Sequence, residues 1–224
     1  MPANERRRAT LPIRIALEAA RQATLASEPD FGKLRGVFAS ADGDMGIVDR
    51  LCETVATDPG QMSPTLFHNS VHNAAAGYWS IGHGSLAATT SLSAGEGSFA
   101  AGLLEAWTQL ASGEGELLLV AFDVPAPPPL AAHRPMLAPF GCALLLGSEP
   151  GNSPLAGLEV SLAGDEGEAT QTVSTPELEP LRLGNPAARA LPLLEALACG
   201  RDASLCLPLS SHQGLRVDLK LGGA

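Results

Sequence analysis

The first third of the chain alternates between helix-like and strand-like hydrophobic patterns. Residues 12–26 carry apolar positions at helical spacing, and the short apolar run 34–40 suits a buried strand. Residues 45–57 predict a second helix. A third helix is predicted from 64 to about 79, because a serine stands before it and a proline at its first position.

A strand, a tight corner and a helix follow in the middle of the chain. Residues 86–92 are small or β-branched, the corner Ser93-Ala94-Gly95-Glu96-Gly97 is punctuated by glycine, and a helix is predicted from about 96 to 110. The predicted core stripe of this helix consists of Phe99, Leu103, Trp107 and Leu110. Its small residues 100–102 leave a slim face, which suits close packing on a second helix or a dimer mate.

The rest of the chain is mainly strand-like. The segment ELLLVAFDV is continuously apolar, as a central parallel strand should be. It is followed by a proline-rich loop (125–139), strands (140–146 and 155–162), an acidic mobile loop (165–180), a helix (186–198) and an antiparallel pair (204–209 with 215–221). This order predicts an α/β fold, a layered αβα architecture with a mostly parallel sheet.

Composition narrows the classes of function. The chain has 224 residues, of which 45% are hydrophobic and 17% charged, a globular composition. Its formal net charge of −10 argues against nucleic acid as a partner. No apolar run reaches membrane-spanning length and charges interrupt the N-terminal segment, so we expect neither a membrane span nor a signal peptide, and a cytoplasmic location.

Cysteine and histidine form no recognisable metal-binding pattern. The four cysteines are scattered, which indicates reduced thiols rather than zinc ligands or disulfides. His68 and His72 are four residues apart and would share one face of a helix, but no third ligand is evident. We therefore predict no metal and no cofactor.

Several segments resemble β-ketoacyl synthases of the thiolase superfamily. SPTLFHNSVHNAAAGYWSIGHGS resembles the helix and loop that line the family's dimer interface and acyl tunnel, and AATTSLSAGEGSFAAGLLEA resembles its strand–nucleophile–helix element. Further matches are ELLLVAFDVPAP, FGCALLLGSE and ERRRATLPIRIALEAA. The resemblance is greatest to the short synthase-like proteins of aryl polyene and xanthomonadin-type pigment pathways.

The resemblance implies one truncated thiolase-like domain over residues 1–224. Residues 1–147 would correspond to the N-terminal half of a ketosynthase, and residues 148–224 to an abbreviated second half. The chain is about half as long as a full synthase, so one copy is not expected to build a complete condensing site.

The family's catalytic groups lack clear counterparts. Alignment on Gly97 and Gly102 puts Ala94 at the position of the family's nucleophilic cysteine, or Ser93 with a one-residue slip. The family also uses two histidines in its second half, whereas His212 is the one histidine after residue 140.

Two interpretations of the corner remain open. As a nucleophile, Ser93 would need an adjacent base, no histidine is near it in sequence, and Glu96 would oppose its activation. Alternatively, Ser93 or Ser91 caps the helix, Gly95 and Gly97 permit the tight corner, and Glu96 favours the helix N-terminus.

The helical segment before the corner is the second candidate region. The resemblance implies that its aromatic and polar side chains lie near a partner interface or an acyl tunnel: Phe67, His68, Asn69, His72, Asn73, Tyr78 and Trp79. Tyr78 and Trp79 also suit packing anchors, and the polar residues could simply form local hydrogen bonds.

Three functional hypotheses follow. The first is a non-catalytic, chain-length-factor-like accessory subunit in polyketide- or fatty-acid-type aryl polyene synthesis, paired with a ketosynthase across residues 65–92. The second is an acyl-transfer or hydrolytic enzyme that uses Ser93. The third is a self-associating binding module that forms a homodimer. An acyl carrier protein is a further candidate partner, although an acidic surface would repel it.

Overall fold

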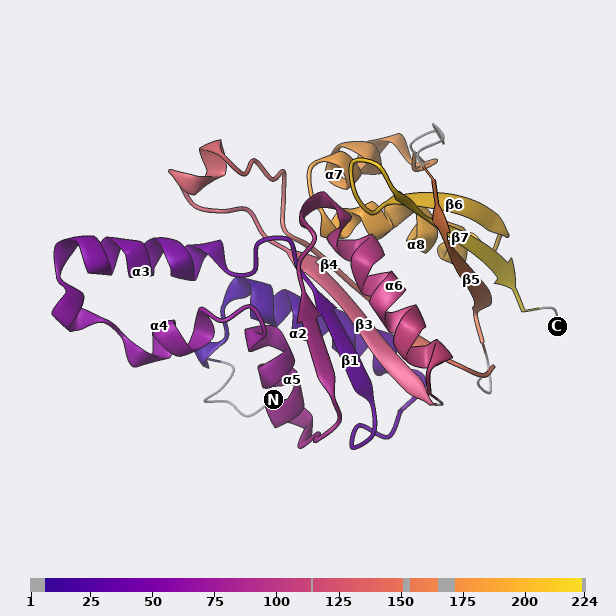
Figure 1. Cartoon of the computed structure of the whole chain (residues 1–224), viewed down its shortest axis with the longest axis horizontal. Helices are drawn as coiled ribbons and strands as arrows, with labels where there is room; N and C mark the ends of the chain where they lie inside the picture. The colour runs from indigo at the N-terminus through magenta and orange to yellow at the C-terminus, as the bar shows by residue number, and fades with distance from the viewer. Residues whose placement is uncertain (1–6, 114, 151–153, 165–171, 223–224) are drawn as a thin grey trace.

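Seven strands form two sheets in the computed structural model, which describes residues 7–113, 115–150, 154–164 and 172–222 (Figure 1). The first sheet has the order β2-β1-β3-β4 and the second the order β5-β7-β6. The strands are β1 (Arg35–Ala39), β2 (Thr89–Leu92), β3 (Glu116–Asp123), β4 (Phe140–Gly147), β5 (Ala156–Ala163), β6 (Ala203–Pro208) and β7 (Gly214–Leu221).

The first sheet is mostly parallel. β1 pairs in parallel with β2 on one side and with β3 on the other, and β3 pairs antiparallel with β4. β3 is buried from its second residue to its last, which explains its continuously apolar sequence. The carboxyl ends of β1, β2 and β3 therefore meet at one edge of the sheet.

Helices cover both faces of this sheet. The helices of the described residues are α2 (Leu11–Thr24), α3 (Met45–Thr57), α4 (Pro64–Asn69), α5 (Ala74–His83), α6 (Ser98–Ala111), α7 (Glu179–Leu183) and α8 (Leu191–Ala198). One core cluster joins α2 and α5 to the sheet, and a second joins the opposite face to α6, α8 and the second sheet. The layers are therefore helix, sheet, helix, sheet (Figure 1).

The single helix predicted from 64 to about 79 is wrong, because the chain breaks between α4 and α5. The Ser70 hydroxyl donates to a carbonyl in the last turn of α4 (2.8 Å). Nε2 of His72 lies 3.0 Å from the carbonyl oxygen of Ser40, which draws this residue toward β1. His68 and His72 consequently do not share a helix face.

The predicted stripe of α6 is correct at its start and wrong at Trp107. Phe99 and Leu103 are buried, whereas Trp107 is 42% exposed. The slim face is packed within this chain. It lies on the first sheet, where a Cβ added to Gly102 would stand 2.9 Å from Cβ of Ala39. The small residues of α6 therefore serve helix–sheet packing.

Two predicted boundaries also change. The strand expected over 86–92 begins at Thr89, and Leu86 is 98% exposed. Of the acidic loop expected over 165–180, residues 165–171 lie outside the described residues, and its end is helical. The short 3₁₀ turn Pro176–Leu178 leads directly into α7.

α3 and α4 project from the body as an arm of residues 45–69 (Figure 1). Ile47 is the buried residue of α3, and Asn69 that of α4. Val55 and Phe67 are 55% and 64% exposed. The arm thus carries apolar side chains that the rest of the chain leaves uncovered.

The described ranges contain neither a membrane-spanning helix nor a cluster of metal-binding side chains. Among the helices there, none combines the length and apolar character needed to cross a membrane. Nor does this part of the chain hold three or more His, Cys, Asp or Glu side chains grouped to bind a metal ion.

Candidate functional site

The candidate site lies at the carboxyl ends of β1, β2 and β3, where three segments meet. These are the turn after β1 (residues 40–44), the corner after β2 (residues 93–97) and Asp123 at the end of β3. Ligands of open α/β sheets characteristically bind at this edge. We refer to these segments together as the strand-end site.

Ser93 is exposed, and its hydroxyl donates to the carbonyl oxygen of Ala41 at 2.7 Å. Within the described residues, this is the hydrogen bond of the Ser93 side chain. It joins the corner to the turn after β1. The described residues give the Ser93 hydroxyl no hydrogen bond to a histidine. The arrangement is that of a structural link, because a nucleophilic serine needs a base at hydrogen-bond distance.

The corner is capped by Ser98, a residue that the sequence interpretation missed. The backbone N–H of Ala94 donates to the Ser98 hydroxyl (3.0 Å), which in turn donates to the carbonyl of Gly95 (2.7 Å). Ser91 and Ser93, the residues expected to cap the helix, do not do so. A serine just inside the predicted helix was the available signal.

Both glycines of the corner are required by its geometry. Gly95 has a φ of +56°, a left-handed conformation that favours glycine. Gly97 is buried, and an added Cβ would collide with the backbone carbonyl of Leu209 in the loop after β6. The corner therefore also anchors the second sheet to the first.

An ion pair makes a further link between the corner and the second half. Nη2 of Arg189 lies 2.9 Å from Oε2 of Glu96. Arg189 belongs to the 3₁₀ turn Ala187–Ala190, and its side chain is 15% exposed. Glu96, which was predicted to favour the helix N-terminus, thus also forms an ion pair with a residue distant in sequence.

Asp123 is the most perturbed acid of the strand-end site. It is 1% exposed, and its Oδ1 accepts hydrogen bonds from the Ser40 hydroxyl (2.9 Å) and the Ala41 N–H (2.8 Å). Burial raises the pKa of Asp123 to about 6, although these hydrogen bonds act to lower it. Its Oδ2 has no partner among the described residues.

Sequence reasoning did not single out Asp123. The available signal was a lone carboxylate at the end of a continuously apolar strand. Burying a carboxylate at such a position costs free energy unless hydrogen-bond donors contact it.

The proline-rich loop closes over the same edge. Arg134 pairs with Asp42 at 2.9 Å, and a cavity of about 120 Å³ lies beneath, lined in part by Asp42, Glu96, Arg134 and Met136. Ser93 is not among its lining residues. The cavity lining thus contains two carboxylates and one guanidinium, and the serine that the sequence suggested as a nucleophile lies outside it.

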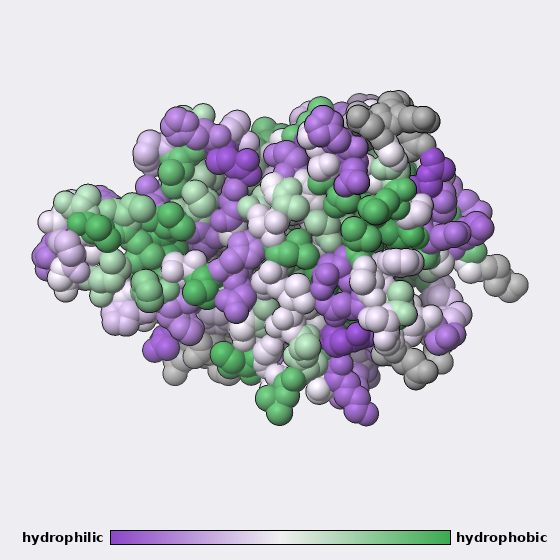
Figure 2. Space-filling model, in the orientation of Figure 1, coloured by the Kyte–Doolittle hydropathy of each residue, from purple (hydrophilic) through white to green (hydrophobic). Residues whose placement is uncertain are grey.

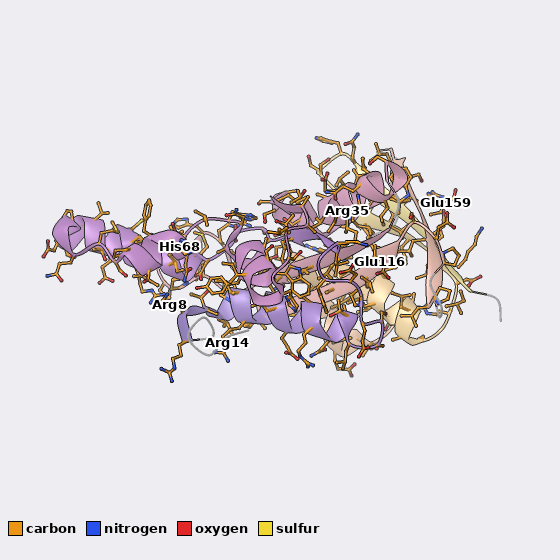
Figure 3. The ribbon with its side chains drawn as sticks, turned by 90° about the horizontal axis from the view of Figure 1, so that it is seen from below. Arg8, Arg14, Arg35, His68, Glu116 and Glu159 are labelled. Atoms are coloured by element: carbon orange, nitrogen blue, oxygen red, sulfur yellow. The ribbon has the colours of Figure 1, made fainter. Side chains whose placement is uncertain are left out.

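The structure separates the residues predicted to lie near a partner or an acyl chain. Phe67 and His68 are exposed on the arm, and Figure 3 labels His68 there. Asn73 is exposed before α5, and half-buried His72 contacts the Ser40 carbonyl. Three of these side chains are thus exposed at the surface, and His72 lies partly beneath it.

The other three are interior. Asn69 is 2% exposed, accepts a hydrogen bond from the Tyr78 hydroxyl (3.2 Å) and donates to the Arg8 carbonyl (3.2 Å). Trp79 is 2% exposed in the core between α5 and the first sheet. Tyr78 and Trp79 therefore act as packing anchors within this chain.

The family of this chain is clear from its sequence profile. The profile described as the β-ketoacyl synthase N-terminal domain matches residues 1–184, so the chain belongs to that family. Among curated proteins no match was found.

Solved structures confirm the thiolase-like ketosynthase fold. A ketosynthase in complex with its chain length factor from Xenorhabdus doucetiae is 22% identical, with a TM-score of 0.70 over 98% of this chain and 81% of that chain. The ishigamide ketosynthase/chain length factor is 17% identical, with a TM-score of 0.74 over 96% and 82%. A β-ketoacyl synthase from Burkholderia phymatum is 10% identical, with a TM-score of 0.71 over 99% and 85%.

Proposed function

We propose that this chain is a non-catalytic, chain-length-factor-like subunit that pairs with a ketosynthase in polyketide- or fatty-acid-type pigment synthesis. The observation that carries the proposal is the corner after β2. There Ala94 offers no reactive group, and the Ser93 hydroxyl is donated to the Ala41 carbonyl at 2.7 Å. Two similar structures pair a chain length factor with a ketosynthase, the role proposed here.

The flank formed by α4, α5 and β2 supports a partner surface across residues 65–92. β2 is the edge strand of the first sheet, so one side of its backbone is unpaired within the described chain. Four large apolar side chains on this flank are 51–98% exposed: Phe67, Val71, Ile81 and Leu86. Figure 2 shows further apolar surface over the arm. A partner on this flank would cover both features.

Pairing is tested by co-expression with a ketosynthase of the proposed pathway, followed by size-exclusion chromatography. We expect a 1:1 complex that Ile81→Asp disrupts, because a buried unpaired charge is costly at an interface. Leu25→Asp is the matched control, since Leu25 is equally exposed (66%) at the end of α2, which packs on β3 and β4. No complex, or unchanged product length after deletion of this chain, contradicts the proposal.

Catalysis through Ser93 is tested separately. Wild-type protein incubated with acyl-carrier substrates should show no covalent adduct by intact mass spectrometry. Ser93→Ala should leave the pathway product unchanged and cost about 1 kcal/mol of stability, because one hydrogen bond is lost. An acyl adduct that Ser93→Ala removes would establish the enzymatic alternative, and a stable homodimer indifferent to the ketosynthase would favour the self-associating module.

A further inference from the structure

We infer that the edge of β5, which is unpaired within the described residues, is a docking site for an extended segment of another polypeptide. The segment would carry apolar side chains at alternate positions, with a lysine or arginine beside Glu159. This site is separate from the proposed ketosynthase interface, which uses β2 in the first sheet.

β5 forms a long and regular edge of the second sheet. β5 pairs with β7 in an unbroken antiparallel register, from Ala156 opposite Leu221 to Ala163 opposite Gly214. Its eight residues contain no proline and no bulge, two devices that commonly protect edges from other strands. β4, an edge of equal length in the first sheet, exposes only its last residue. β5 is the less protected edge.

The apolar layer on the inner face of β5 is incompletely covered. Directly opposed residues of an antiparallel pair point to the same face of the sheet. Leu215 is 0% exposed, yet Leu162 opposite it on β5 is 60% exposed. In Figure 2 apolar residues gather between α6 and the second sheet. The cover that buries β7 therefore reaches Val160 in the middle of β5 but not Leu162 near its end.

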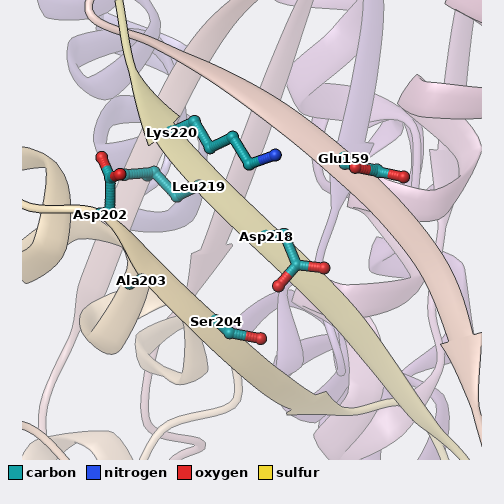
Figure 4. Close-up of a pocket in the computed structure, with 7 residues that line it drawn as sticks. All are labelled: Glu159, Asp202, Ala203, Ser204, Asp218, Leu219 and Lys220. Atoms are coloured by element: carbon teal, nitrogen blue, oxygen red, sulfur yellow. The ribbon is translucent and has the colours of Figure 1, made fainter.

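The outer face of β5 and β7 carries two opposed carboxylates. Glu159 stands directly opposite Asp218, and like charges in this position destabilise a pair of strands. Both carboxylates line an open depression of about 460 Å³ with Asp202, Ser204 and Lys220 (Figure 4). A lysine or arginine on a strand added beside Glu159 would meet these carboxylates.

These features fit strand addition by a basic, amphipathic segment. In this mode of recognition, main-chain hydrogen bonds provide affinity and alternate side chains provide specificity. A second copy of this chain is the weaker fit. It would bring another formal charge of −10 and another opposed pair of Glu159 and Asp218 to this edge.

The test uses two blocked synthetic octapeptides, one alternating leucine with lysine and one alternating leucine with glutamate. We expect the leucine–lysine peptide to bind by calorimetry and to slow amide hydrogen exchange in β5 but not in β2. Glu159→Lys should weaken this binding about tenfold and strengthen binding of the leucine–glutamate peptide, because the local charge is reversed. Leu162→Ser should weaken both peptides.

Glu149→Lys is the matched control, because it changes the net charge equally at an exposed position just after β4. Near-UV circular dichroism confirms that each variant is folded. Equal losses in Glu149→Lys and Glu159→Lys, or peptide binding without protection of β5, would overturn the inference. Protection of β5 by concentration-dependent dimerisation without peptide would also overturn it, since the occupant would then be a second copy.

Discussion

At the residue scale, the strand-end site is defined by polar groups that hold neighbouring segments together. Asp123 accepts hydrogen bonds from Ser40 and Ala41, and Ser93 donates to the same Ala41. Ser98 fixes the corner from within α6. Each of these groups satisfies backbone atoms that would otherwise be unpaired in a largely buried region.

The titration of Asp123 predicts a pH dependence of stability. Its pKa is raised from 3.8 to about 6 in the folded chain, so folding favours the neutral acid. This contribution is complete below the unfolded-state pKa and is lost as the pH rises through about 6. The stability of the wild type relative to Asp123→Asn should therefore fall by on the order of 3 kcal/mol between pH 4 and pH 7. Urea unfolding of both proteins at the two pH values measures this difference, and parallel pH profiles would contradict the assignment.

At the scale of elements, close backbone approaches decide where the chain turns. The His72 contact with β1 breaks one predicted helix into α4 and α5. At the corner, Gly97 lets the loop after β6 approach the start of α6. Hydrophobic periodicity carries no information about such contacts, because they involve backbone atoms of segments distant in sequence.

Substitution of glycine separates these packing effects from helix propensity. Gly97→Ala should cost about 3 kcal/mol, because the new Cβ collides with the Leu209 carbonyl. Gly77 lies within α5 with no atom within 4 Å of an added Cβ, so Gly77→Ala should instead stabilise the chain by about 0.5–1 kcal/mol. Thermal or urea unfolding measures both, and equal effects of the two substitutions would refute the collision.

At the scale of the whole molecule, the two sheets share one core. A single apolar cluster runs from β1 and β3 through α6 and α8 to β6 and β7. The Glu96–Arg189 ion pair and the Gly97–Leu209 contact cross the same boundary. The second half is therefore expected to unfold together with the first.

Leu193 tests this cooperativity. It is 0% exposed in α8, so Leu193→Ala should cost about 2–5 kcal/mol. In a Trp107→Phe background Trp79, which lies in the other core cluster, is the one tryptophan, and its fluorescence should report the same shifted midpoint as far-UV circular dichroism. Separate transitions would show that the two halves unfold independently.

The sequence by itself determined most elements, the family resemblance and the absence of a cysteine at the corner. Helix and strand periodicity is local, so α2, α3, β3 and the pair β6–β7 were predicted close to their observed positions. Only the tertiary structure decided that Asp123, Ser40 and Ser93 meet, that α6 buries its glycine face on the sheet, and that β5 is left as an open edge. These properties depend on which distant segments lie side by side, and burial, hydrogen bonding and charge act there irrespective of separation along the chain.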